Sequence, residues 1–511
     1  MSLLASCGSP TPPRRDVVIG LIGEPDSVFA DDARAQLLEA AVTESLVRRD
    51  ARDELVARLA DAVPTFENGG LRFVTDDPSA PSGRLVAVFR LRDNARWQDG
   101  RPITAPDVRF AYEEDRGAAV GTERRYRADR IEAVEVIDDR SVRVLYRAGE
   151  RWPDYALAPG VMPRHILSGA TPDARTGYAR RPVHAGPFAV AAWIGGFGVT
   201  LSAFPDYVLG RPPLGRIEVR FLRDRAAMLD ALRRGDIDVA PSPALEADLS
   251  GVVDEIADDT DRSGLRAFYT QTEGLEVLRY GPRLTDPRVR RAISLTVDRS
   301  RIISSIFGGR ARVPSSYLVP PQRYAAEGDP AARPDVPTAR GLMAAAGYRP
   351  GTFGILERGG DRLVVTLLVA SGSDPRLEAA RMVAGDLAAV GIAADVRQRS
   401  DVEIGAAIAR SEFDLALMPE AASDALGASD RYAGRAGPWF DTLALAARDA
   451  GDLDQRSLYA ELQRLWRESN AALPLYQRLA VDVAPRSLAA VQPSPAGAPL
   501  TWNAHEWAFR R

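Results

Sequence analysis

Segments with the pattern of a buried strand alternate with amphipathic helical segments along most of this chain of 511 residues. Residues 17–23 read VVIGLIG, which predicts a buried strand, and residues 31–47 have the spacing of an amphipathic helix. Farther on, a helical segment that begins at Arg225 stops at Gly235, and a strand follows. Such alternation is typical of α/β folds, and the length predicts about three folding units.

A second pattern, of paired strands, lies between these α/β segments. Residues 84–92 are strand-like, and the segments 131–139 and 141–147 carry near-alternating apolar residues on either side of a tight turn. Three further strand-like segments follow Gly186 before the helical pattern returns. The sequence therefore predicts two α/β bodies plus a β-rich insertion.

Helix boundaries are clearer in the second half of the chain. Asp286 is a typical N-cap, and Pro287, whose φ angle is fixed near the helical value, suits the first helical position. The pair therefore predicts a helix over 288–307. Asp374–Pro375 starts another helix, for which Gly391 is the expected C-terminal signal. The spacing of leucine and tryptophan predicts a further helix over 454–470. Strand-like segments follow these last two helices, so the alternation continues to the end of the chain.

Charge balance and residue types exclude several functions. The 66 cationic residues are all arginine and face 70 acidic ones, so the net charge of −4 predicts no general affinity for nucleic acid. Without lysine there is no P-loop lysine or Schiff base. His165, His184, His505 and Cys7 lie far apart, so no metal or cofactor is expected, and the histidines are interpreted as packing or hydrogen-bonding residues. With no GxSxG, HExxH or Walker A motif, no enzyme activity is expected.

The N-terminal segment 1–15 has the features of a lipid-anchored tether. Residues 4–7 read Leu-Ala-Ser-Cys, which resembles the bacterial lipobox, and a stretch rich in serine, proline and arginine follows Cys7. Six residues are too few for the charged and apolar regions of a signal peptide, so we expect that the sequence starts late, and the true start of the signal peptide stays open. No later stretch approaches the ~20 apolar residues of a membrane span, so attachment is expected through lipid alone.

Residues 90–113 contain a motif that points to a family. Asp99–Gly100 predicts a turn, and Thr104 with Asp107 predicts a capping box at the start of a helix. The run resembles a recurring motif of the family 5 extracellular solute-binding proteins, the oligopeptide, dipeptide and nickel receptors of ABC importers. The matching residues are Trp97, Asp99, Gly100, Pro102, Ile103, Thr104, Ala105, Asp107 and Val108. We interpret them as structural, because caps and turns specify a fold and not a ligand.

The resemblance continues in the same order along about residues 16–511. Further matching segments are 161–167, 184–193, 205–221, 232–240 and 286–303. It implies an α/β, two-lobed periplasmic-binding-protein fold of class II-like type, with a β-rich inserted domain and a hinge between the lobes. The implied domains are lobe I (16–45, 182–268 and 487–511), an inserted domain (46–181) and lobe II (269–486).

The resemblance also indicates where a ligand would bind. In peptide receptors of this family an Asp after a Phe-Asp strand pairs with the ligand's α-ammonium, and here that segment is 413–430. Gap-free matching places Ser423 at the Asp position, whereas a shift of one residue places Asp424 there; Glu420 takes the place of a usual aromatic. Because an ammonium without a carboxylate partner loses much of its binding energy, this departure leaves peptide recognition open.

A second group of candidate ligand contacts follows the first strand. Glu24, Asp26 and Ser27 match the family's early cleft segment and lie at a strand's carboxyl end, where open α/β sheets bind ligands. Trp193 and Trp439 are candidates for apolar walls, with core packing as the alternative for both.

The expected function is that of a monomeric, extracytoplasmic lipoprotein that captures peptides between its lobes and delivers them to an ABC permease by hinge closure. It would lie on the outer face of the cell membrane or in the periplasm. The alternatives are the same receptor class binding an oligosaccharide or a metal chelate, a secreted hydrolase that uses Asp424 or Glu24, and a scaffold that has lost ligand binding.

Overall fold

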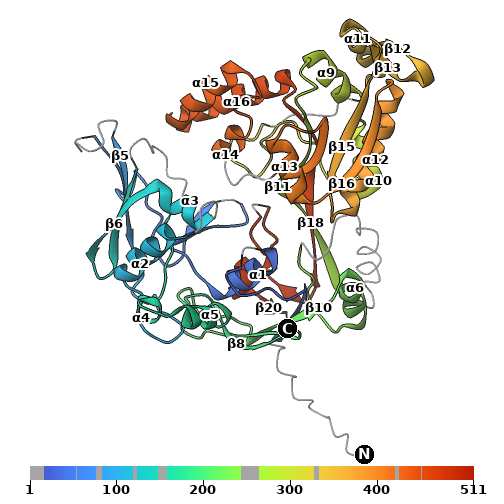
Figure 1. Ribbon diagram of the computed structural model, residues 1–511. Helices are drawn as coiled ribbons and strands as arrows, with labels where there is room; N and C mark the ends of the chain where they lie inside the picture. Colours follow the sequence, from blue (N-terminus) through green and yellow to red (C-terminus); the bar gives the residue numbers. More distant parts are fainter. Residues whose placement is uncertain are drawn as a thin grey trace, which may run out of the picture.

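The computed structural model shows two lobes joined by long strands (Figure 1). Among the residues it describes, no helix is long and apolar enough to cross a membrane. The described residues are 16–30, 32–52, 54–75, 83–118, 123–147, 158–242, 264–326, 333–420, 425–449, 452–495 and 497–510.

Lobe I is built on a four-stranded sheet of order β1-β10-β9-β8, in which β1 and β10 are parallel and the other pairs antiparallel. Its apolar core includes the fully buried Val17, Ile19 and Trp507. Its elements are β1 (Asp16–Ile22), α1 (Ala33–Val42), β8 (Phe188–Ile194), β9 (Gly198–Ala203), β10 (Arg216–Leu222), α6 (Arg225–Arg234), β19 (Leu488–Ala489), the 3-10 helix η4 (Leu500–Glu506) and β20 (Ala508–Phe509).

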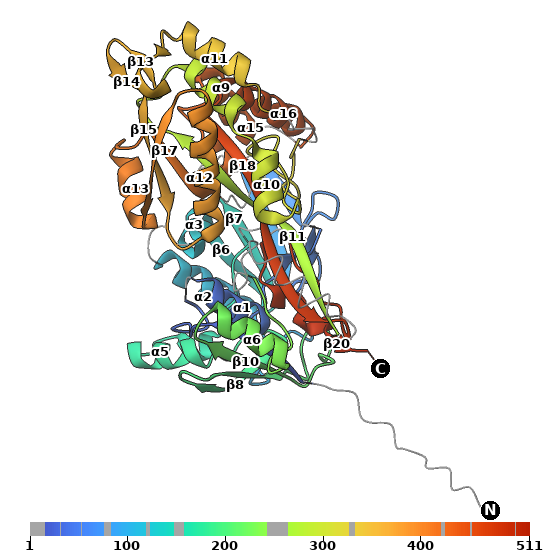
Figure 2. The same cartoon turned by 90° about the vertical axis from the view of Figure 1, so that its right-hand side faces the viewer.

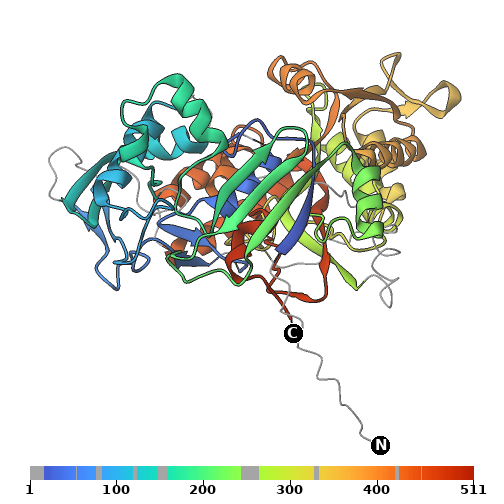
Figure 3. The ribbon, with the colours of Figure 1, turned by 90° about the horizontal axis from the view of Figure 1, so that it is seen from below.

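Between α1 and β8 the chain forms a separate β-rich unit with its own core around Trp97 (Figure 3). Its antiparallel sheet has the order β4-β5-β7-β6, which includes the hairpin expected over 131–147. The elements are β2 (Val47–Arg49), β3 (Leu55–Ala57), β4 (Leu71–Val74), β5 (Arg84–Arg90), α2 (Ala105–Arg116), α3 (Glu123–Arg130), β6 (Ile131–Asp138), β7 (Ser141–Tyr146), α4 (Arg164–Leu167) and α5 (Pro172–Arg180).

Lobe II contains a five-stranded sheet of order β16-β15-β17-β11-β18, in which β15 is parallel to both β16 and β17. Its strands are β11 (Leu265–Tyr280), β15 (Val364–Ala370), β16 (Ala393–Arg399), β17 (Leu415–Glu420) and β18 (Ala472–Pro485). Its helices are α9 (Pro287–Thr296), α10 (Arg299–Phe307), α11 (Val336–Ala345), α12 (Asp374–Ala389), α13 (Asp401–Ala409), α14 (Ala425–Asp430), α15 (Pro438–Asp449) and α16 (Asp452–Ser469). Three short strands, β12 (Arg349–Pro350), β13 (Leu356–Arg358) and β14 (Asp361–Arg362), and the 3-10 turn η3 (Thr352–Gly354) complete it.

Two long antiparallel strands, β11 and β18, connect the lobes (Figure 2). Near lobe I, residues 265–271 pair with 479–485, and Val483 also bridges Ala240 after α6. After an irregularity, residues 275–279 pair with 472–477 inside the lobe II sheet. The same two strands therefore belong to the core of one lobe and to the connection with the other.

The expected helix over 31–47 is shorter in the structure, which ends α1 at Val42 and begins β2 at Val47. The carbonyl of Val42 accepts from the backbone N–H of Gly186 at 2.9 Å and from the side-chain amide of Gln98 at 3.2 Å. Because partners distant in sequence satisfy the helix end, the helix stops there although its apolar pattern continues.

The helix expected over 288–307 is two helices, α9 and α10. The Asp298 carboxylate accepts from the N–H of Arg301 at 2.9 Å and caps α10, while its own N–H donates to Asp386 at 2.9 Å. Helix α12 starts at Asp374 as expected, but the residue that caps it is Ser373. Local hydrogen bonds thus decided boundaries that apolar periodicity missed.

The motif residues near Trp97 join the β-rich unit to lobe I. The Gln98 side-chain amide donates to the carbonyls of Val42 and Phe188, and its oxygen accepts from the N–H of His184 at 3.0 Å. The rings of Trp97 and His184 meet edge to face, with centroids 5.6 Å apart, and both are buried. These contacts support the structural interpretation of the motif.

The capping box in the same motif forms as expected. The Asp107 carboxylate accepts from the N–H and the hydroxyl of Thr104, each at 2.9 Å, and its second oxygen accepts from the N–H of Arg164 at 3.1 Å. His165 Nε2 lies 2.7 Å from the Asp99 carboxylate. Both contacts hold α4 against the turn that begins α2.

His184 predicts a pH dependence of stability. Burial lowers the pKa of His184 from 6.5 to about 4, so as the pH falls through this interval the unfolded chain takes up a proton that the folded chain excludes. The free energy of unfolding should fall by about 1.4 kcal/mol per pH unit from this group and level off below about pH 4. Chemical denaturation of the protein and of His184→Gln at several pH values gives, for each, the slope of the free energy of unfolding against pH. The two slopes should differ by the uptake of about one proton on unfolding. Equal slopes in the two proteins would contradict the assignment.

Candidate functional site

The carboxyl ends of the parallel strands in the two sheets face each other across the lobes. Arg225, just after β10, lies 3.9 Å from the carboxylate of Asp374, just after β15. Open α/β sheets bind ligands at the carboxyl ends of their strands. This geometry marks the region between the two sheets as the candidate site.

Lobe I has a pocket of about 500 Å³ between α1, the β2–β3 hairpin, α3 and the C-terminal segment. One face of α1 forms a wall, since Gln36, Glu39, Ala40 and Thr43 recur at helical spacing. Figure 1 shows α1 and α3 on the side of the lower half that is turned toward α14. The other lining residues are Ser45, Val47, Arg48, Arg49, Leu55, Arg127, Ala158, Pro159, Gly160, Ser494, Gly497, Ala498, Pro499 and Trp502.

A buried charge cluster supports the floor of this pocket. The Glu44 carboxylate lies 3.7 Å from the guanidinium groups of both Arg48 and Arg58 and accepts a short hydrogen bond from the hydroxyl of Tyr207. Burial alone would raise the pKa of Glu44, but the two arginines and the hydrogen bonds outweigh it, so the pKa is lowered. Arg58 also lies 3.3 Å from His505 Nε2, and burial lowers the pKa of His505 to about 4. At neutral pH the cluster therefore contains two cations, one anion and a neutral histidine.

None of these pocket residues was among the candidates from sequence. The segments that form the pocket are far apart in the chain; for example, Arg48 donates to the carbonyl of Trp502 across 454 positions. The exposed Gln36 and partly buried Glu39 and Thr43 within a mostly buried helix are the only local signal of this wall.

The candidates after β1 lie at the carboxyl edge of the lobe I sheet. The Glu24 carboxylate accepts from the indole N–H of Trp193 at 2.7 Å and from the N–H of Gly196 at 2.8 Å. The Trp193 hydrogen bond, then that from Gly196, lowers the pKa of Glu24. The Asp26 carbonyl accepts from Arg180, and the Ser27 hydroxyl accepts from the N–H of Phe29. The structure thus brings Glu24 and Trp193 together, and in it Glu24 holds the β8–β9 turn.

Glu420 is buried at the end of β17. Its carboxylate accepts short hydrogen bonds from Arg279 and, at 2.6 Å, from the hydroxyl of Tyr432, and it lies 3.5 Å from Arg431. Burial and the Glu420 charge raise the pKa of Tyr432 well above its usual value. Glu420 therefore already has three partners within lobe II.

Of the other lobe II candidates, the structure describes only Trp439. Ser423 and Asp424 lie outside the described residues, as does Cys7. Trp439, at the start of α15, is 75% exposed and so does not pack in the core. Within the described residues the structure does not join Trp439 to Glu420 by a hydrogen bond or a ring contact.

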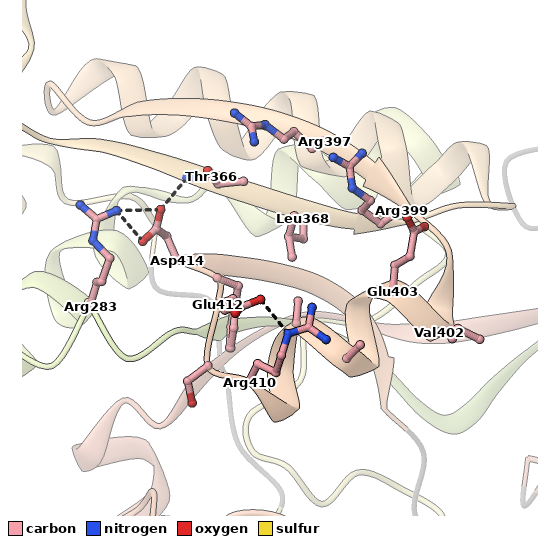
Figure 4. Close-up of a pocket in the computed structure, with 14 residues that line it drawn as sticks. Arg283, Thr366, Leu368, Arg397, Arg399, Val402, Glu403, Arg410, Glu412 and Asp414 are labelled. Carbon is pink, nitrogen blue, oxygen red and sulfur yellow. Dashed lines mark hydrogen bonds and ion pairs between the residues drawn. The ribbon is translucent and has the colours of Figure 1, made fainter.

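A second cavity, of about 660 Å³, lies between α13 and the strands β15 and β16 (Figure 4). Arg283 lies 3.1 Å from the buried Asp414, and Arg410 lies 2.8 Å from Glu412. Arg397, Arg399 and Glu403 line the same cavity, so its described wall carries four arginines and three carboxylates. Among the residues that the structure describes, no group of three His, Cys, Asp or Glu is arranged to hold a metal ion.

A two-lobed α/β fold in which strand ends of the two lobes face each other, with a pocket on one lobe, fits a protein that binds a small ligand. Residues 74–433 match the bacterial extracellular solute-binding proteins, family 5 Middle, and the chain belongs to this family. It is a solute-binding protein of the ABC-transporter class.

Two relatives of the chain are named as peptide-binding proteins. It is 25% identical over 390 residues to the oligopeptide-binding protein AppA of Bacillus subtilis, a match that covers 74% of this chain and 68% of AppA. It is 26% identical over 455 residues to the di/tripeptide-binding protein 2 of Pseudomonas aeruginosa, covering 81% and 82% of the two chains.

The fold is shared with solved structures. The ABC transporter substrate-binding protein CtaP of Listeria monocytogenes superposes with a TM-score of 0.81 at 19% identity, over 98% of this chain and all of that one. This similarity confirms the two-lobed fold that the sequence predicted.

Replacing Glu420 tests its structural role. Glu420→Gln leaves Arg279 and Arg431 without their buried carboxylate, and we expect the free energy of unfolding to fall by about 3 kcal/mol. Thermal and urea unfolding measure the loss. Glu412→Gln removes an exposed carboxylate from a nearby pair and should change stability by less than about 0.5 kcal/mol. Equal stability of the two variants would contradict the structural role and leave Glu420 available to a ligand.

Proposed function

We propose that this protein captures peptides between its lobes and delivers them to the permease of an ABC importer. The observation that carries the proposal is the lobe I pocket along α1, together with the contact of Arg225 after β10 with Asp374 after β15 between the lobes. Family membership and the peptide-binding relatives support the same function. A ligand between the lobes would contact the α1 wall on one side and the segment after β17 on the other.

Hinge closure is the motion that this proposal requires. We assign residues 16–45, 182–268 and 487–511 to lobe I, 46–181 to the inserted domain and 269–486 to lobe II. The β11–β18 pair and the bridge of Ala240 to Val483 are the described connections at the boundary, which supports a hinge there. A peptide that contacts both lobes binds the closed form more tightly and so shifts the population toward it.

Ligand recovery tests the peptide assignment. We expect mass spectrometry of the denatured, purified protein to release peptides, and peptides to raise the melting temperature of ligand-free protein. A peptide at about 100 times its dissociation constant should add about 2.7 kcal/mol to the free energy of unfolding. If the ammonium binds at Asp424, Asp424→Ala should lose this stabilisation whereas Ser423→Ala keeps it. Stabilisation by oligosaccharides or metal chelates alone would overturn the peptide assignment and keep the receptor class.

Lipid attachment through Cys7 is the second part of the proposal, and it would hold the monomeric receptor near its permease. The support is the Leu-Ala-Ser-Cys segment ahead of a proline-rich tether. When the chain is expressed behind a cysteine-free signal segment, labelled palmitate should be incorporated and Cys7→Ala should abolish the labelling. Label retained in Cys7→Ala, or absent from the unmodified chain, would contradict attachment at this residue.

A further inference from the structure

Three arginines gather at the end of lobe I that carries the C-terminus. Arg266 lies near the start of β11, Arg486 follows β18 and Arg510 follows β20. The backbone N–H of Arg486 donates to the carbonyl of Gly264 at 2.7 Å. The N–H of Arg510 donates at the same distance to the carbonyl of Ser487, the neighbour of Arg486. We call the three arginines the basic patch.

Carboxylates do not neutralise the basic patch. Within the part of the chain that the structure describes, none of its guanidinium groups forms an ion pair. Arg266 instead donates to the carbonyl of Leu488 at 3.0 Å and lies over the ring of Phe268, 4.6 Å from its centroid. Burial, then the positive charges of Arg510 and Arg486, lower the pKa of Arg266. The patch therefore holds like charges that an anion from outside the lobe would stabilise.

The patch lies on the side of lobe I that is away from lobe II. Arg486 and Arg510 are exposed, and Arg266 is half-buried. Figures 1 and 2 both show β20, which ends just before Arg510, low in lobe I, with the helices of lobe II at the top. An anionic surface can therefore reach the two exposed arginines without entering the region between the lobes.

The tether joins lobe I at the same core. β1 begins at Asp16, and the next residue, Val17, lies in one apolar core with Leu488, two positions after Arg486. The nine peptide links from Cys7 to Asp16 span at most about 30 Å. The two residues that precede Asp16 in sequence are also arginines. A lipid on Cys7 would thus keep lobe I close to the bilayer surface.

We propose that the basic patch binds the anionic phospholipid headgroups of the membrane to which the tether is anchored. The inference goes beyond peptide capture and does not depend on it. Guanidinium groups bind phosphate through charge-assisted hydrogen bonds, and basic residues near an anionic bilayer are attracted to its surface. A short tether raises the effective concentration of that surface, so individually weak contacts are sufficient.

Binding to vesicles tests the proposal. The full chain without lipid is mixed with vesicles of phosphatidylcholine alone, or of phosphatidylcholine and phosphatidylglycerol in equal parts, and flotation measures the bound fraction. We expect binding to the anionic vesicles to be about tenfold tighter, although the net charge of the chain is −4. Raising NaCl from about 50 mM to about 500 mM should remove the difference, because salt screens charge attraction. Equal binding to both kinds of vesicle at low salt would overturn the proposal.

Arginine variants locate the contact. Arg486→Gln and Arg510→Gln remove exposed cations, and each should weaken binding to anionic vesicles about fivefold, which corresponds to ~1 kcal/mol. Arg381→Gln and Arg464→Gln remove the same charge from the exposed surfaces of α12 and α16 in lobe II and should leave binding unchanged. Melting temperatures of the four variants confirm folding. If the lobe II variants weaken binding as much as the patch variants, total charge explains the attraction and the patch is overturned.

Coupling through Cys7 tests the orientation. Cys7 is the only cysteine of the chain, so a maleimide lipid attaches the protein to vesicles at that residue whether or not a cell acylates it. Phenylglyoxal modifies accessible guanidinium groups, and mass spectrometry measures the rate at each arginine. On anionic vesicles the rates at Arg486 and Arg510 should fall severalfold relative to neutral vesicles, while the rate at Arg381 stays the same. Unchanged rates at Arg486 and Arg510 would overturn the proposal, and a failure of peptide capture would not affect this measurement.

Discussion

The pairing of β11 with β18 is the constraint on which the rest of the structure depends. In the lobe II sheet β18 is an edge strand and β11 is the strand next to it, and the other halves of both strands extend to lobe I. A buried bidentate pair between Glu276 of β11 and Arg376 of α12, with Nε to Oε1 at 2.6 Å, ties the first turn of α12 to the same strand. Because separating two buried charges is costly, the strand end of β15 and the start of α12 keep their place relative to the connection.

The same connection explains why the candidate site has one wall on each lobe. Lobe I presents its strand ends and the polar face of α1, and lobe II presents the ends of β15 and β17. Buried clusters around Glu44 and Glu420 lie near these walls. In each cluster one carboxylate forms ion pairs with two arginines.

Much of the fold was predictable because local chemistry agrees with it. The capping box of Thr104 and Asp107 forms, Gly235 ends α6 with a left-handed φ of 70°, and the hairpin near 131–147 pairs as expected. The predictions were wrong at the end of α1, where distant partners satisfy the helix end, and in the middle of 288–307, where the Asp298 side chain caps the start of a second helix. Apolar spacing predicts which face of a helix is buried. It does not predict which carbonyl at a helix end accepts a hydrogen bond from a donor in another domain.

The sequence by itself determined the family, the α/β alternation and several helix boundaries, since these follow from turn residues, caps and the order of short motifs. It also pointed to the carboxyl edge of β1, where Glu24 and Trp193 meet. Only the tertiary structure decided the pocket, because α1, the β2–β3 hairpin, α3 and the C-terminal segment become neighbours only when the inserted unit docks on lobe I. Charge balance in such a site is a property of spatial neighbours, and no single segment of the chain carries it.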